Sequence, residues 1–264
     1  MAIKNNLFKN LIIFELANNH MGDLNHGLKI INSYKKFIKK FNFQFAFKLQ
    51  YRHLNTFIHK NYKKRNDLHY IKRFNDTKLN EKQFNILTNH IKKNGFKSIA
   101  TPFDEKSVDL IIKQNLDYIK IASCSFNDWP LLEKIVTTNK PLVLSTAGAD
   151  FQTIRNVVSF LKNRSKNFSL MHCVGEYPTP KNKLNLNRID LLKEEFPDIP
   201  IGYSTHEDPS DYDGIKIAAS KGAELFEKHV GVSSNRYQLN KYSVDIQKCE
   251  KWLLSLKQTI KSSK

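Results

Sequence analysis

Short apolar runs alternate with longer amphipathic stretches along most of this chain. The run 11–17 (LIIFELA) predicts a buried strand, because continuous apolar residues over this length are typical of strands covered on both faces. In 22–41, Leu28, Ile31 and Tyr34 recur at helical spacing and predict an amphipathic helix. The same patterns predict strands over 43–50, 98–103, 118–123, 141–146, 168–174, 199–204 and 225–230, and helices over 81–94, 105–115, 130–138, 151–164, 187–195, 211–221 and 244–260.

The order of these elements indicates the fold class. Eight strands, each followed by a helix or a helix-containing connection, predict a parallel sheet with helical crossovers. Eight such units in 264 residues favour a closed barrel, so we predict an α/β protein with a (β/α)8 TIM barrel as a single domain over 1–264. The polar, aromatic stretch 51–79 is predicted to be a long loop. A doubly wound sheet is the alternative, but the chain lacks the glycine-rich first turn of dinucleotide-binding folds.

The chain is strongly basic, with 43 Lys and Arg against 25 Asp and Glu and a formal net charge of +18. Such a charge indicates either an acidic partner or a lysine-rich solvated surface. The lysines are spread from Lys4 to Lys264, mostly on the polar faces of predicted helices, which favours the solvated surface. No zinc finger, basic zipper or RNP-type strand occurs, so we expect no nucleic-acid partner.

The cysteines and the N-terminal residues indicate in which cellular compartment the protein is expected. Cys124, Cys173 and Cys249 are odd in number and have no framework spacing, which fits a reducing cytoplasm. The stretch 1–14 has no long apolar region and no small-residue cleavage site, so we expect no signal peptide. No apolar run is long enough to cross a bilayer. We therefore expect a cytoplasmic protein with no membrane partner.

Two lysines lie within apolar strands, where burial of a lone charge is costly. Lys48 lies in FAFKLQ and Lys120 in YIKIAS. One interpretation is that they are barrel-interior lysines paired with Glu15 or Glu227. The other is that they form an anion site for phosphate or carboxylate, which nearby hydroxyl residues favour.

Two histidines end consecutive predicted strands. Neighbouring strands lie about 4.8 Å apart, so the imidazoles of His206 and His229 could reach one divalent ion, although a lone histidine is more often structural. Nitrogen ligands beside carboxylates suit Mn²⁺, Fe²⁺, Co²⁺ or Zn²⁺ better than Ca²⁺.

In order along the chain, several motifs resemble those of the N-acetylneuraminate (sialic acid) synthase family. They cover most of the chain, and their combination is far more specific than any one of them. The segments are FELANNHMGDL (14–24), FKLQ (47–50), ATPFDEKSVDLI (100–111), YIKIAS (118–123), PLLEKI (130–135), KPLVLSTAG (140–148), LMHCVGEYPTP (170–180), IGYSTHE (201–207) and GAELFEKHVG (222–231).

The resemblance implies a (β/α)8 catalytic barrel and a reaction. Family enzymes condense phosphoenolpyruvate with an N-acylated amino sugar and release phosphate, which gives a 2-keto-3-deoxy sugar acid of the nonulosonic type. A divalent metal, most often Mn²⁺ or Mg²⁺, polarises the open-chain aldehyde as a Lewis acid. The implied enzyme is a C–C bond-forming transferase of carbohydrate biosynthesis whose partners are phosphoenolpyruvate and an aldose.

The resemblance also implies roles for individual residues. His206 and His229 match the metal ligands, and Glu15 matches a carboxylate near the metal that is suited to proton transfer. The positions that match phosphoenolpyruvate-binding groups are Lys48, Thr101, Lys120, Ser123, Ser145 and Ser204, and those that match sugar-contacting groups are Gln50, Phe103 and Tyr177.

The departures from the family pattern fall mostly on the sugar side, although Gly175 stands where the family has an Asn that helps hold phosphate. Ser123-Cys124-Ser125 stands where the family usually has Ser-Gly-Glu, and Asn240 aligns roughly with an Asp near the metal. The antifreeze-like C-terminal domain is absent from this sequence. Family members are dimers that exchange that domain, so a homodimer remains open here. We expect an acceptor sugar other than N-acetylmannosamine.

Two further functions stay open. The lost carboxylates are compatible with a non-catalytic barrel that binds a sugar or phosphorylated ligand within a glycan-biosynthesis assembly. A different metal-dependent barrel reaction, such as an aldol cleavage, would form pyruvate from a keto acid without any dependence on phosphate.

Overall fold

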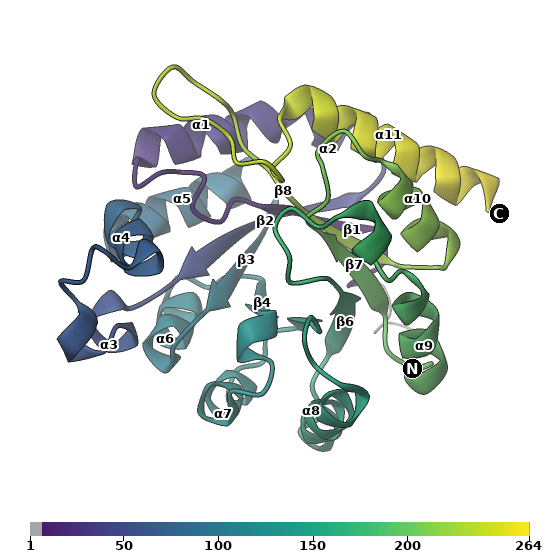
Figure 1. Ribbon diagram of the computed structural model, residues 1–264, viewed down its shortest axis with the longest axis horizontal. Helices are drawn as coiled ribbons and strands as arrows, with labels where there is room; N and C mark the ends of the chain where they lie inside the picture. Colours follow the sequence, from purple (N-terminus) through teal and green to yellow (C-terminus); the bar gives the residue numbers. More distant parts are fainter. Residues whose placement is uncertain (1–6, 264) are drawn as a thin grey trace.

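Eight parallel strands close into a barrel in the computed structural model, which describes residues 7–263 (Figure 1). Each strand pairs with the strands before and after it in sequence, and β1 completes the barrel by pairing with β8. The predicted (β/α)8 fold is confirmed. The strands are β1 Leu11–Glu15, β2 Gln44–Tyr51, β3 Lys97–Pro102, β4 Tyr118–Ile121, β5 Leu142–Ser145, β6 Phe168–His172, β7 Ile201–Thr205 and β8 Leu225–His229.

Helices surround the strands (Figure 1), and most of them begin at a side chain that caps free backbone N–H groups. Among the described residues, no helix is long and apolar enough to cross a membrane. The α-helices are α1 Leu24–Tyr34, α2 Lys36–Lys40, α3 Leu54–Phe57, α4 His69–Asp76, α5 Glu81–Lys93, α6 Glu105–Lys113, α7 Trp129–Val136, α8 Phe151–Asn163, α9 Asn187–Glu195, α10 Asp213–Ser220 and α11 Ile246–Ser262.

The structure corrects two of the predicted elements. The stretch 51–79 is not one long loop, because it contains α3, α4 and the short 3₁₀ helix Lys60–Tyr62 between them. These short helices contact each other and the barrel: the Phe57 ring lies 5.8 Å from that of Phe74 and 6.2 Å from that of Phe103, contacts that periodicity does not reveal. The predicted helix 22–41 is interrupted at Lys35 and forms α1 and α2.

The barrel interior has an apolar lower layer and a polar upper layer, since alternate residues of each strand face inward. On β1, for example, Leu11 and Ile13 belong to the interior apolar cluster, and Glu15 is the next residue on the same face. A second, larger cluster fills the space between strands and helices. The polar side chains therefore collect at the carboxyl ends of the strands, above an apolar floor of Phe8, Leu11, Ile13, Ala46, Ile99, Tyr118, Val143, Met171 and Leu225.

Candidate active site

A chain of buried ion pairs lies at the centre of the polar layer. The Lys48 Nζ lies 2.7 Å from Glu227 Oε1, and the Lys120 Nζ lies 2.9 Å from Glu227 Oε2. Lys48 also pairs with Glu15, which is its neighbour in strand register. These four side chains are at most 6% exposed. We call Glu15, Lys48, Lys120 and Glu227 the central charge cluster.

The pairing interpretation of the two lysines is therefore what the structure shows. Glu227 joins them, and Ser204 Oγ donates a further hydrogen bond of 3.1 Å to Glu227 Oε1. When all four members are ionised, the two ammonium and two carboxylate charges cancel. The cluster alone thus offers an incoming anion hydrogen-bond donors but no excess positive charge.

Burial and the neighbouring charges strongly shift the pKa values of residues in the central charge cluster. Burial by itself raises the pKa of Glu227, but Lys120 and Lys48 outweigh burial and hold that pKa far below its ordinary value. Burial lowers the pKa of Lys48 to about 7, although Glu227 partly offsets the effect. Lys48 is thus a cation that loses its proton near neutral pH unless further negative charge approaches it.

The hydroxyl residues surround this cluster from different strands. Thr101 and Ser145 are buried on the inward faces of β3 and β5, where strand alternation places them in the polar layer. Ser123 begins the 3₁₀ helix Ser123–Ser125 just after β4. Its Oγ accepts a 3.1 Å hydrogen bond from the Ala147 N–H and lies 3.2 Å from Cys173 Sγ. The structure thus brings the predicted phosphoenolpyruvate residues together at one end of the barrel.

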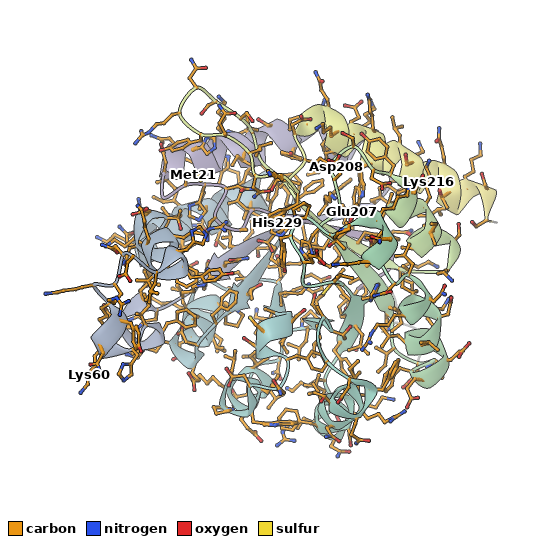
Figure 2. The ribbon with its side chains drawn as sticks, in the orientation of Figure 1. Met21, Lys60, Glu207, Asp208, Lys216 and His229 are labelled. Atoms are coloured by element: carbon orange, nitrogen blue, oxygen red, sulfur yellow. The ribbon has the colours of Figure 1, made fainter. Side chains whose placement is uncertain are left out.

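The two predicted metal ligands also meet. The imidazole centroids of His206 and His229 lie 5.3 Å apart, and His229 lies over the middle of the barrel in Figure 2. The His206 Nδ1 lies 3.2 Å from the Val174 carbonyl oxygen, whereas the buried His229 Nδ1 has no hydrogen-bond partner. Burial lowers the pKa of His206 to about 3 and that of His229 well below its ordinary value, so both rings are neutral at pH 7.

Neutral imidazoles with a free nitrogen are the form that binds divalent transition metals. The orphaned His229 nitrogen and the short distance between the rings fit a metal held by two protein ligands. Within 7–263, no three His, Cys, Asp or Glu side chains are arranged to hold an ion. A metal here would therefore complete its coordination with water or substrate. Asn240 is not a candidate ligand, since its Oδ1 accepts hydrogen bonds from the N–H groups of Tyr242 and Ser243.

The three predicted sugar-contacting residues lie in two groups. Tyr177 is 54% exposed and its ring lies 4.1 Å from that of His206, beside the histidine pair. Gln50 and Phe103 are joined on the opposite side by Arg52, which donates a 2.8 Å hydrogen bond to Gln50 Oε1 and stacks 3.8 Å from the Phe103 centroid. A cavity of about 610 Å³ opens beside them and is lined by Gln50, Arg52 and residues of α4, α5 and α6.

Three residues of the site region were not predicted from sequence as site residues. Glu227 organises both lysines, Arg52 organises the sugar side, and Tyr242 packs 5.0 Å from the His229 ring. The signal for Arg52 was present, because Lys48, Gln50 and Arg52 follow the period of two that places residues on one face of a strand. The signal for Tyr242 was absent, since it lies in the irregular connection after β8.

The fold and the position of these groups define a (β/α)8-barrel protein with a buried polar site at the carboxyl ends of its strands. A family model described as the NeuB family matches residues 44–262. The chain belongs to the NeuB family, which confirms the resemblance to sialic acid synthases.

Three relatives illustrate the match. The N,N'-diacetyllegionaminic acid synthase of Campylobacter jejuni is 34% identical over 244 residues, with 86% of this chain and 69% of that protein covered. A crystal structure of a spore coat polysaccharide biosynthesis protein E from Chromobacterium violaceum superposes with a TM-score of 0.94 at 49% identity and covers 96% of this chain and 76% of that one. An N-acetylneuraminic acid synthetase from Leptospira borgpetersenii, solved with citrate, gives a TM-score of 0.84 at 28% identity and covers 98% and 85%. The chain spans about two thirds of the length of the first curated relatives it matches.

Proposed function

We propose that this chain is a phosphoenolpyruvate-dependent synthase that condenses phosphoenolpyruvate with an aldose, releases phosphate and forms a 2-keto-3-deoxy sugar acid. The observation that carries the proposal is the central charge cluster set beside the His206–His229 pair in one buried layer. Relatives named as legionaminic acid and sialic acid synthases support the same reaction class. In the balanced reaction, C3 of phosphoenolpyruvate bonds to the aldehyde carbon, water adds at C2, and inorganic phosphate leaves.

We assign the site residues of this chain the following roles in the proposed reaction. Lys48 and Lys120 would use their remaining N–H donors for charge-assisted hydrogen bonds to the carboxylate and phosphate of phosphoenolpyruvate while they stay paired with Glu227. Thr101, Ser123, Ser145 and Ser204 add neutral donors around that ligand. Glu15 lies in register with Lys48 on one side and His229 on the other, where it can accept or return a proton.

We further propose that His206 and His229 hold a divalent cation, Mn²⁺ or Mg²⁺, which when bound would supply Lewis-acid polarisation of the aldehyde. The charge balance of the site gives an independent reason for it. Because the central charge cluster is neutral, a nearby divalent charge would supply the excess positive potential that a trianionic ligand needs. Localisation in the cytoplasm and assembly as a homodimer stay predictions.

Metal and phosphoenolpyruvate should therefore bind cooperatively. We expect Mn²⁺ to tighten phosphoenolpyruvate binding at least about 10-fold, and phosphoenolpyruvate to tighten Mn²⁺ binding by the same factor, because binding linkage is reciprocal. Calorimetry measures the affinity for phosphoenolpyruvate with and without Mn²⁺. Electron paramagnetic resonance measures the affinity for Mn²⁺ with and without phosphoenolpyruvate, and neither measurement needs turnover. The double variant H206A/H229A should abolish the coupling. Coupling that survives in this variant would place the metal elsewhere.

Phosphoenolpyruvate binding should also change the protonation of Lys48. Its pKa is about 7 without a ligand, and a bound anion raises the pKa of a neighbouring cation. At pH 8 the free protein has mostly lost this proton, so binding takes up a proton; at pH 6 the proton is already present and no uptake occurs. Calorimetry at each pH in buffers of different ionisation enthalpy measures the uptake. Equal uptake at pH 6 and pH 8, or uptake unchanged in Lys48→Met, would contradict this assignment.

One observation favours a second function, a barrel that binds without catalysis: the charges of the central cluster cancel in the protein itself. The two functions are separated by incubating the protein with phosphoenolpyruvate, Mn²⁺ and a panel of amino sugars. The synthase should release phosphate with at least one sugar. Saturable phosphoenolpyruvate binding without phosphate release from any sugar would favour the binding protein.

A further inference from the structure

The side of the site away from the histidines contains a partly buried cation, Arg52. Within the part of the chain that the structure describes, the Arg52 guanidinium forms no ion pair, its Nη2 donates to Gln50, and its buried Nε has no hydrogen-bond acceptor. The nearby carboxylate of Asp104 acts against burial and raises the pKa of Arg52, but it forms no ion pair with the guanidinium, and its oxygens accept hydrogen bonds from the backbone N–H groups of His53 and Ser107 and from Ser107 Oγ. Burial lowers the pKa of Arg52 only to about 10, so it remains charged at pH 7.

Two aromatic rings fix the orientation of this guanidinium. It stacks 3.8 Å from the Phe103 centroid and 4.6 Å from the Phe74 centroid, and Nη2 donates to Gln50. These ring contacts hold the guanidinium beside Gln50, while its Nε has no hydrogen-bond acceptor within residues 7–263. In-plane N–H donors on a planar fork match the geometry of a carboxylate or a phosphate.

The cavity beside Arg52 favours negative charge as a whole. Lys78 and Lys106 line it together with Arg52. Its single lining carboxylate, Glu81, is already paired with Lys113 outside the cavity. The cavity of about 610 Å³ is of the size that holds a small ligand.

Arg52 lies directly after β2, the strand that carries Lys48 of the central charge cluster. Lys48, Gln50 and Arg52 share one face of β2 and its continuation, and four residues of strand span roughly 13 Å. An acceptor whose aldehyde meets phosphoenolpyruvate near Lys48 would therefore extend its carbon chain past Gln50 toward Arg52.

We propose, on the basis of the proposed function, that the acceptor aldose carries an anionic group, a carboxylate or a phosphate, at the end remote from its aldehyde, and that Arg52 binds this group. Arg52 then selects the acceptor, while the lysines bind phosphoenolpyruvate. Phe74 contributes by holding the guanidinium in place from α4.

Binding of three matched sugars tests the proposal without turnover. The probes are N-acetylmannosamine, its 6-phosphate and its C6 uronate, titrated calorimetrically into the full chain. We expect at least one anionic sugar to bind at least about 10-fold more tightly than the neutral sugar, and the comparison between the phosphate and the uronate identifies the anion. Equal affinities for all three sugars would overturn the proposal.

Variants then assign the preference to Arg52. Arg52→Gln should remove the preference for the anion and leave phosphoenolpyruvate affinity unchanged, and Arg52→Lys should retain part of it because the charge remains. Arg65→Gln is the matched control, since Arg65 is exposed, lies in the same segment and pairs with Asp67. A preference that survives in Arg52→Gln, or competition of the anionic sugar with phosphoenolpyruvate for one site, would overturn the proposal.

The same sugars separate this inference from the function on which it rests. If the anionic sugars bind through Arg52 but no sugar releases phosphate, the synthase proposal fails and the anion site stands. If the neutral sugar is turned over at least as efficiently as both anionic ones, the synthase stands and the role of Arg52 fails.

Discussion

Replacing Lys120 with methionine should lower kcat/KM for phosphoenolpyruvate about 10- to 100-fold. Lys120 is 2% exposed in its side chain, and loss of one charge-assisted hydrogen bond to a buried anion costs about 1.5–3 kcal/mol, where each 1.4 kcal/mol is tenfold. Methionine keeps an unbranched, apolar chain of similar length in an interior that already holds Met171 3.4 Å from the ammonium group. Glu227 keeps its bonds to Lys48 and Ser204, so the barrel should stay folded.

Steady-state phosphate release measures this effect, with circular dichroism to verify folding. The substitution should lower kcat/KM for phosphoenolpyruvate. The KM for the acceptor sugar should stay within a few fold of the wild-type value. Lys134→Met serves as the control, because Lys134 is partly exposed and pairs with Asp109 on the outer helices. A Lys120→Met protein with nearly wild-type kcat/KM would remove Lys120 from the site.

The second large effect concerns stability. Glu227→Gln should lower the free energy of unfolding by about 3–5 kcal/mol, the cost of removing one partner from a buried ion pair. The amide leaves Lys120 without a carboxylate and Lys48 with Glu15 alone. For a domain of this size, the melting temperature should fall on the order of 10 °C.

Thermal and denaturant unfolding measure the change. Glu195→Gln is the matched control, since it breaks a surface pair with Arg155 and surface pairs contribute about 1 kcal/mol or less. Phosphoenolpyruvate should raise the melting temperature of Glu227→Gln more than that of the wild type, because the bound anion restores negative charge beside Lys120. If Glu227→Gln has the same melting temperature as Glu195→Gln, the ion pairs of Glu227 with Lys48 and Lys120 do not stabilise the barrel.

The sequence predicted most of the barrel because its strands are short, apolar and regularly spaced between helices. Period-two alternation also accounts for the site, since Lys48, Gln50, Glu227 and His229 lie on inward faces that the apolar pattern alone determines. Where such residues fall on a strand was therefore predictable.

Pairing of the lysines with Glu15 or Glu227 was one of two interpretations of the sequence, and the pattern alone could not choose between them. Glu227 and Lys120 are 107 residues apart, and the sequence left open whether the lysines meet a carboxylate. The short helices α3 and α4 were missed for a related reason. The helix α4 has no buried residue of its own, and its Phe74 packs against Phe57 and Arg52, contacts that only the folded chain creates.

The central claim is that this barrel joins C3 of phosphoenolpyruvate to an aldose. It is tested most directly with phosphoenolpyruvate labelled with ¹³C at C3, Mn²⁺ and the neutral and anionic amino sugars, followed by mass spectrometry and a phosphate assay. We predict a labelled keto acid with the mass of the aldose plus pyruvate, formed in equal amount to the released phosphate and formed much more slowly by Lys120→Met. Folded, metal-loaded protein that forms no labelled adduct with any sugar, or that releases only pyruvate, would contradict it.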